Sequence, residues 1–209
     1  MATLKPTQSY HHGDLRNALI KTCLAVLVEN GVEALSLREV ARRAGVSHTA
    51  CYRHFADREA LLAAVAAEGF ERLLQDLTAA STGAPDAVAA LQRGLHAYLN
   101  FGYAHPQYVQ LMFGIDMSAK QPALKDVATK AFDALVQLVT AALPTGSAPE
   151  SRSLALALWA EVHGLLVLST ALRLQDIAPG DQPSDAARLA LDALFVRIIP
   201  AAHREAVDS

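Results

Sequence analysis

Residues 36 to 55 read SLREVARRAGVSHTACYRHF, and this stretch decides the fold. Ser36 and Glu39 form an S-x-x-E capping box, which predicts that a helix begins directly after the serine. Gly45 falls where that helix must end with positive φ, a conformation that glycine adopts at little cost. Ser47 can then cap a second short helix. The stretch is predicted to form two short helices joined by a tight turn.

The second of these helices has one apolar and one polar face. Cys51 and Phe55, four residues apart, give it an inward side. The outward side carries donors, cations and aromatic hydroxyls: His48, Thr49, Tyr52, Arg53 and His54. Such groups suit phosphates and base edges, and exposed N–H groups at the helix starts near Ser36 and Ser47 favour phosphate. The alternative is a solvated surface helix, with Tyr52 packed against the next helix. Arg38 and Arg42 are read as surface charges or as phosphate contacts.

The flanking segments extend the pattern to a small helical unit. A helix is expected over 14–30 with an apolar stripe of Leu15, Ala18, Leu19, Cys23, Val26 and Leu27, ending at Gly31. Asp57 can cap a long helix that begins at Arg58. Three helices and the start of a fourth are typical of a helix-turn-helix domain that binds DNA.

The stretch YHHGDLRNALIKTCLAVLVENGVEALSLREVARRAGVSHTACYRHFADREALLAAV resembles the N-terminal domain of TetR-type transcriptional regulators over residues 10–65. It shares their Gly-Val…Leu-Ser-Leu entry and Tyr-x-x-Phe exit. The segment WAEVHG, with Trp159, His163 and Gly164, resembles the Trp-His-Gly signature in the C-terminal domain of one subgroup, and the YHHGDLR opening is similar to the same subgroup.

The resemblance implies roles for individual residues. The positions matching His48, Thr49, Tyr52 and His54 touch bases or phosphates in such proteins, and those matching Ser36 and Arg58 meet the sugar-phosphate backbone. Two positions depart from the pattern. Arg58 stands where lysine is usual and keeps the cation, and Cys51 stands where leucine is usual and is smaller. Tyr10, His11, His12 and Arg16 are expected near the DNA side as arm contacts.

Composition favours an all-α protein that can bury a substantial core. The 209 residues are 52% apolar and 6% aromatic, with few β-branched stretches. The net charge is −3, but residues 1–62 hold eight lysines and arginines against six acidic residues, and the remainder holds ten against fifteen. This asymmetry fits a DNA-binding head on an acidic body, although the excess of two charges is small.

About nine helices are expected, near 14–30, 37–44, 48–54, 58–79, 86–105, 106–113, 122–143, 149–174 and 184–199, with loops at 114–121, 144–149 and 175–184. We divide the chain into a helix-turn-helix domain over 1–62, with a flexible arm over 1–9, and a helical effector-binding and dimerisation domain over 63–209. Cys23 and Cys51 are expected to be buried free thiols, which fits a reducing cytoplasm.

The predicted C-terminal domain over 63–209, which we call the body, carries aromatic and polar residues that would suit an effector pocket. The candidates are Tyr98, Phe101, Tyr108, Met112, Trp159 and His163. Trp159 and His163 lie four residues apart and project from one helix face. Core packing is the competing interpretation, and a metal site built from His96, His105 and His163 is disfavoured by their spacing. Neither a catalytic motif nor a cofactor motif is found.

The most apolar segment, 154–172, is nearly long enough to cross a bilayer, but Glu161 and His163 near its middle argue against a membrane helix. Burial against a second copy is expected instead. We therefore expect a cytoplasmic, ligand-responsive transcriptional regulator, without a cofactor or enzymatic activity, that binds a near-palindromic operator as a homodimer. The effector would be small and apolar or of mixed polarity. Two alternatives remain open: an all-helical ligand-binding or enzymatic domain whose N-terminal hairpin only dimerises, and a protein-interaction adaptor that uses the same hairpin.

Overall fold

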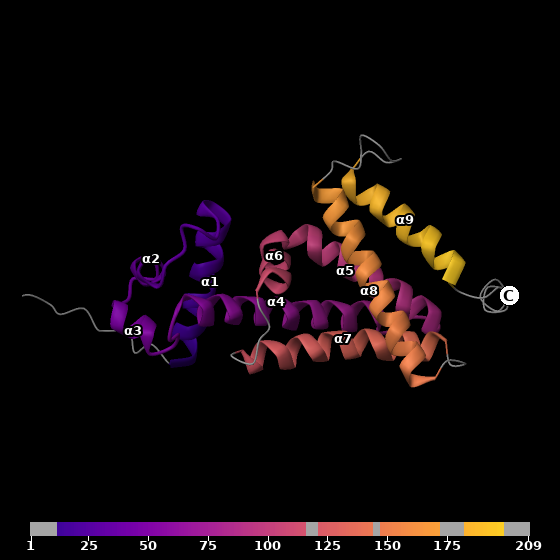
Figure 1. Ribbon diagram of the computed structural model, residues 1–209, viewed down its shortest axis with the longest axis horizontal. Coiled ribbons are helices and arrows are strands. Elements are labelled where there is room, and N and C mark those ends of the chain that lie inside the picture. Colours follow the sequence, from indigo (N-terminus) through magenta and orange to yellow (C-terminus); the bar gives the residue numbers. More distant parts are fainter. Residues whose placement is uncertain (1–11, 116–120, 144–146, 172–181, 199–209) are drawn as a thin grey trace, which may run out of the picture.

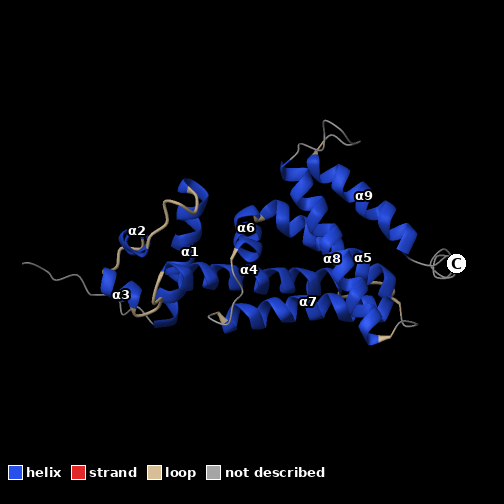
Figure 2. Ribbon diagram, viewed as in Figure 1, coloured by secondary structure: helices blue, strands red, loops and turns tan. Residues whose placement is uncertain are grey.

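The computed structural model describes residues 12–115, 121–143, 147–171 and 182–198, and this part of the chain forms nine helices and no strand (Figure 2). The helices are α1 (His12–Asn30), α2 (Leu37–Arg43), α3 (His48–Tyr52), α4 (Arg58–Ser81), α5 (Ala87–Ala104), α6 (Pro106–Gly114), α7 (Pro122–Ala142), α8 (Ala148–Ala171) and α9 (Pro183–Ile198). The predicted all-α class is confirmed.

Helices α1 to α3 and the start of α4 form the N-terminal part of the molecule, which we call the head. The helix caps predicted in this head are formed as expected. The Ser36, Ser47 and Asp57 side chains accept hydrogen bonds from the third residue of α2, α3 and α4 at 3.1, 3.1 and 2.7 Å. Gly45 follows the C-cap of α2 and has φ of 67°, in the left-handed region, where the chain turns towards α3. Ala41 is buried where α2 and α3 meet. Local sequence therefore determines both helices of this hairpin.

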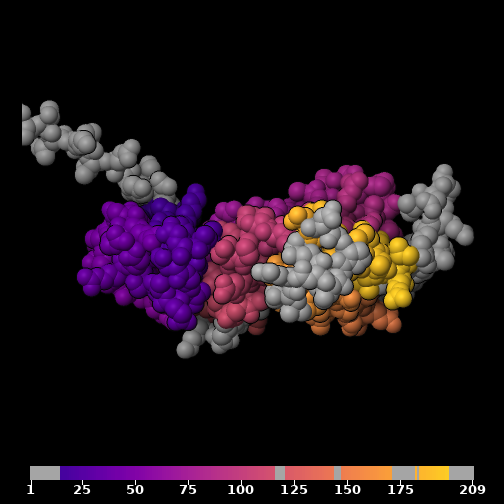
Figure 3. Space-filling model, turned by 90° about the horizontal axis from the view of Figure 1, so that it is seen from above, coloured from indigo at the N-terminus to yellow at the C-terminus, as the bar shows by residue number. Residues whose placement is uncertain are grey.

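Helix α4 joins the head to the rest of the molecule (Figure 1). Its first turns pack against α1, and its remaining length packs against α5, α6 and α7. Phe70, Leu73 and Leu77 on α4 are buried in the core of the body. In the space-filling view the head lies at one end of an elongated molecule, and α8 and α9 lie towards the other (Figure 3).

Helix α8 packs across α5, α7 and α9. At the crossing with α5, a Cβ placed on Gly102 would lie 2.1 Å from Leu166 Cδ2, so only glycine allows this approach. The outer face of α8 and α9 is exposed and apolar: Leu156, Val167, Leu168, Leu189 and Val196 are between 44% and 60% exposed. Ala148–Thr170 is long and apolar enough to cross a membrane, although Glu161 and His163 lie within it. Exposed apolar side chains that gather on one face in this way are typical of a surface that another protein segment or molecule covers.

The helix boundaries agree with the sequence prediction to within three residues wherever they can be compared. Cys23 and Cys51 are buried free thiols, as expected. The predicted arm over 1–9, Tyr10, His11 and most of the loops at 114–121 and 175–184 lie outside the described residues, as does the predicted extension of α8 to residue 174.

Candidate functional site

Helix α3 presents its polar side to solvent. Ser47, His48, Thr49, Tyr52 and Arg53 are all exposed, and Tyr52 retains 48% of its surface although it is aromatic. The inward residues are Cys51 at 0% and Phe55 at 3% exposure. Tyr52 is therefore not part of the buried core, and about half of its surface is free for a contact. A short helix with donors and aromatic hydroxyls on its free side has the chemistry of a nucleic-acid contact surface.

Two contacts order this surface. The rings of His48 and Tyr52 meet edge to face, with centroids 4.7 Å apart. His54, just beyond the end of α3, is partly buried, and its backbone N–H donates to Cys51 O at 3.0 Å. His48, Thr49 and Tyr52 thus lie together on the free face, whereas His54 lies at its margin.

Ser36 and Ser47 are both exposed at helix starts and both accept a backbone N–H through the side-chain oxygen. A serine hydroxyl that accepts one hydrogen bond still has its own O–H to donate. Each serine can therefore hold its helix and donate to a phosphate oxygen at the same time.

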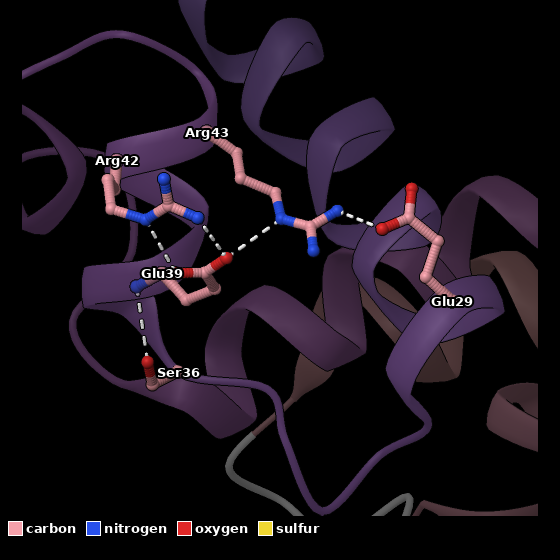
Figure 4. A network of polar contacts seen from close by, with 5 residues as sticks. All are labelled: Glu29, Ser36, Glu39, Arg42 and Arg43. Atoms are coloured by element: carbon pink, nitrogen blue, oxygen red, sulfur yellow. Dashed lines mark hydrogen bonds and ion pairs between the residues drawn. The ribbon is translucent and has the colours of Figure 1, made fainter.

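Two of the three arginines on α2, Arg42 and Arg43, are paired with carboxylates (Figure 4). Glu39 accepts two hydrogen bonds from Arg42 at 2.8 and 2.7 Å and one from Arg43 at 2.8 Å, and Arg43 also pairs with Glu29. Hydrogen bonds from Arg42 and then Arg43 lower the pKa of Glu39 to about 2. Arg42 is thus partly neutralised, while Arg38 and Arg53 form no ion pair within the described part of the chain.

Arg58 is placed differently from the other candidate DNA contacts. Its Nε donates to Leu35 O at 3.0 Å, and its Nη2 donates to Val32 O at 2.6 Å. Two of its three guanidinium nitrogens therefore tie the start of α4 to the loop between α1 and α2. A lysine ammonium could not reproduce this forked geometry. The structural role was not apparent from the sequence, where Arg58 was read only as a phosphate contact.

Three of the six pocket candidates meet in the body. Trp159 Nε1 lies 3.3 Å from Tyr98 Oη, and Tyr98 Oη lies 2.9 Å from His163 Nδ1. Burial raises the pKa of Tyr98 and lowers that of His163. Tyr98 and Trp159 also line a narrow void of about 10 Å³. This group joins α5 and α8 through polar contacts inside an apolar body.

The other three candidates lie along α5 and α6 and do not line that void. Phe101 stacks on Tyr108, whose hydroxyl donates to Glu68 Oε1 at 2.9 Å. Arg72 donates to the same carboxylate oxygen and lies over the Tyr108 ring. Met112 is buried at the crossing of α4 and α6, where it faces Gly69. These contacts hold α6 against α4 and α5.

The three histidines whose spacing disfavours a shared metal site lie apart from one another in the structure. His96 pairs with Asp192 on α9, His163 bonds to Tyr98, and His105 packs against Phe101 with ring centroids 5.2 Å apart. Within the described ranges, no three histidine, cysteine or acidic side chains gather as metal ligands would.

An exposed polar helix held after a tight turn, on a small helical head, defines a helix-turn-helix protein. Residues 19–65 match the family model described as bacterial regulatory proteins, tetR family, and residues 91–194 match the model of the tetracyclin repressor-like C-terminal domain. The chain belongs to the TetR family of transcriptional regulators.

Individual proteins resemble this chain in sequence or in fold. The tetracycline repressor protein class C of Escherichia coli is 45% identical over 51 residues, which span 24% of this chain and 23% of that protein. A protein of unknown function from Rhodococcus sp. RHA1 superposes with a TM-score of 0.78 at 33% identity, covering 93% of this chain and 100% of that chain. A TetR/AcrR-family regulator from Thermobifida fusca YX-ER1 has a TM-score of 0.67 at 17% identity, covering 87% and 97%, and shares the fold.

Proposed function

We propose that this protein is a ligand-responsive repressor that binds a near-palindromic DNA operator as a homodimer in the cytoplasm. The observation that carries the proposal is the free polar face of α3, with exposed Thr49 and Tyr52 and with Ser36 and Ser47 at the adjacent helix starts. An apolar outer face on α3 would have favoured the alternative in which the hairpin only dimerises. The proposed division at residue 62 falls inside α4, and the Trp-His-Gly subgroup remains a prediction.

Within this proposal the residues of the head have two kinds of role. Thr49 is exposed on the free face of α3 and is small enough to read a base edge, and His48 lies beside Tyr52 on the same face. Tyr52, Ser36, Ser47 and His54 would contact phosphates. Phosphate contacts add affinity on any sequence, whereas base contacts set the sequence preference.

A titration of operator DNA separates these roles. Genomic fragments near the protein's own gene should show saturable binding that weakens steeply with salt, because bound phosphates release counterions. Tyr52→Ala should weaken binding to all sequences alike, and Thr49→Ala should relax the preference at one base position. Thr129→Ala is the matched control, because Thr129 is an exposed threonine on α7 in the body. Unchanged affinity and preference in Thr49→Ala would refute its base-reading role. A protein-interaction adaptor would show no such salt dependence.

Dimerisation is proposed to occur through the exposed face of α8 and α9. Val167 and Leu168 on α8 and Leu189 and Val196 on α9 are exposed in one protomer, and two such faces would form a four-helix bundle around a two-fold axis. Glu161 on this face would then need a cation from the partner, because a buried unpaired carboxylate is costly. The axis would place two α3 helices about one helical turn of DNA apart.

The matched pair Leu189→Glu and Val28→Glu tests this interface. The two side chains are similarly exposed, at 54% and 57%, but Val28 lies on α1 in the head. Sedimentation should show that Leu189→Glu shifts the protein to a monomer and that Val28→Glu leaves the dimer intact. A monomeric parent protein, or equal behaviour of both variants, would contradict the proposed interface.

An effector bound in the body is proposed to control DNA binding. The polar group formed by Tyr98, Trp159 and His163 gives an apolar interior the few polar atoms that orient a ligand. The effector can shift the spacing of the two heads only by its difference in affinity for the two states.

A further inference from the structure

Trp159 stands between two spaces in the body. On its outer side a groove of about 300 Å³ runs between α7 and α8. On its inner side lies the void of about 10 Å³, bounded by Tyr98, Ala131 and Val162. A void of this size holds about one water molecule. No organic ligand fits it unless the Trp159 indole moves, and moving the indole would join the void to the groove.

Few directional contacts hold the indole in place. Its ring stacks on Phe132, with centroids 5.1 Å apart and planes at 27°. Its one hydrogen bond, to Tyr98 Oη, is long at 3.3 Å. Phe113 meets its edge at 6.1 Å and is itself 41% exposed. A flat apolar group that took the indole's place against Phe132 would restore the stacking contact that the indole gives up.

Tyr98 Oη makes two polar contacts. An indole N–H can only donate, so Tyr98 Oη accepts from Trp159, and it also contacts His163 Nδ1 at 2.9 Å. The void itself is lined by uncharged and mostly apolar side chains, and it suits the apolar part of a ligand.

The outer groove is cationic although the body as a whole is acidic. Lys125 and Arg152 line it, and none of its lining residues is acidic. Arg152 is held by Asp133 at 2.8 Å and lies over the Phe132 ring at 4.9 Å. Lys125 has no ion-pair partner in the part of the chain that the structure describes. A free ammonium group beside the partly exposed rings of Phe132 and Trp159 complements a ligand with an anionic head group and an apolar remainder.

We propose that the α7–α8 groove admits a small aromatic monocarboxylate, whose ring displaces the Trp159 indole and enters the void while its carboxylate stays on Lys125. This inference deepens the proposed function by naming the class of effector, and it rests on that function. The Trp159 indole separates the groove from the void until the ligand displaces it. Phe132 is the surface on which first the indole and then the ligand ring stacks.

Fluorescence tests the proposal directly, because Trp159 is the only tryptophan of the chain. The probes are phenylalkanoates from phenylacetate to 5-phenylvalerate and their neutral amides, titrated into the full-length protein. At least one acid should change the emission saturably, and its amide should bind about fivefold more weakly, as expected for one partly exposed ion pair. No saturable change with any acid, or equal affinity for acid and amide, would overturn the proposal.

A matched pair of lysine variants locates the carboxylate. Lys125→Met should weaken binding of the acid about fivefold and leave binding of the amide unchanged. Lys130→Met is the control, because Lys130 lies on the same helix but pairs with Asp126 and does not line the groove. If both variants bound the acid as the parent protein does, the assigned carboxylate site would be wrong.

Quenching by acrylamide tests whether the indole moves. Displacement should make Trp159 more accessible, so that quenching rises when the acid is bound. A fall in quenching would mean that the ligand covers the groove without opening the void. That result would refute the proposed displacement of the Trp159 indole. Operator binding is measured separately. Intact DNA binding with no difference in affinity between acid and amide would refute this inference alone. Absence of specific DNA binding together with a preference for the acid would refute the proposed function alone.

Discussion

Replacing Arg58 by methionine should destabilise the head of the protein rather than merely weaken DNA binding. The guanidinium donates to Val32 O and Leu35 O at 2.6 and 3.0 Å and so connects the start of α4 to the loop between α1 and α2. Each such bond contributes about 1 kcal/mol net, the value of a typical neutral hydrogen bond rather than the larger one of a charged donor, because the site is only partly buried. The loss should be about 2 kcal/mol, which corresponds to a fall in Tm of about 4 to 8 °C for a chain of this size.

The assay is thermal and urea unfolding at one fixed protomer concentration, since dimerisation would make the midpoint depend on concentration. Arg53→Met is the control, because Arg53 is an exposed cation five residues earlier, and its loss should change stability by less than about 0.5 kcal/mol. Arg58→Lys should recover only part of the loss, because an ammonium cannot span both carbonyls with a rigid fork. If Arg58→Met unfolded at the same midpoint as Arg53→Met, while both lost DNA affinity, Arg58 would be a phosphate contact and the structural role argued here would be refuted.

Two further predictions concern a carboxylate and a pair of glycines. The pKa of Glu39 is lowered from 4.5 to about 2 in the folded protein, so its contribution to stability is complete above about pH 4.5 and is lost as the pH falls towards 2. The difference in urea midpoint between the parent protein and Glu39→Gln should therefore narrow over that range, and a constant difference would contradict the assignment. Gly102→Ala should destabilise the protein by about 1 to 3 kcal/mol, because the new methyl group collides with Leu166. Gly164→Ala, where the added Cβ meets nothing within 4 Å, should instead raise the stability of dilute protomer by about 0.5 to 1 kcal/mol, and equal effects of the two changes would show that the crossing at Gly102 is not tight.

The parts of the fold that sequence predicts correctly are those determined by neighbouring residues. Ser36, Ser47 and Asp57 cap the helices that they precede, and Gly45 adopts the positive φ that its position after α2 requires. The polar face of α3 follows from the burial of Cys51 four residues before Phe55. Each of these features depends on contacts within a few residues, which the linear pattern records.

The features that sequence did not predict depend on which helix faces meet. Arg58 reaches carbonyls 23 and 26 residues earlier in the chain, and nothing in its local pattern identifies them. Spacing placed Trp159 and His163 on one face of α8, but it could not show that Tyr98, rather than Phe101, meets them from α5. The groove was missed for the same reason, because Lys125 and Phe132 come from α7 and Arg152 from α8.

Helix α4 is continuous over the 24 residues from Arg58 to Ser81, with no proline between its ends. At about 1.5 Å per residue it is a rod of about 36 Å, so a rotation of about 10° at its far end would carry the other end through about 6 Å. Opposite swings in two symmetric copies would change the separation of their tips by up to about 12 Å, roughly a third of the 34 Å repeat of the double helix. In the proposed dimer, a small rearrangement near Leu77 would thus be magnified along α4, and the spacing required by the DNA would be lost without any unfolding of the head.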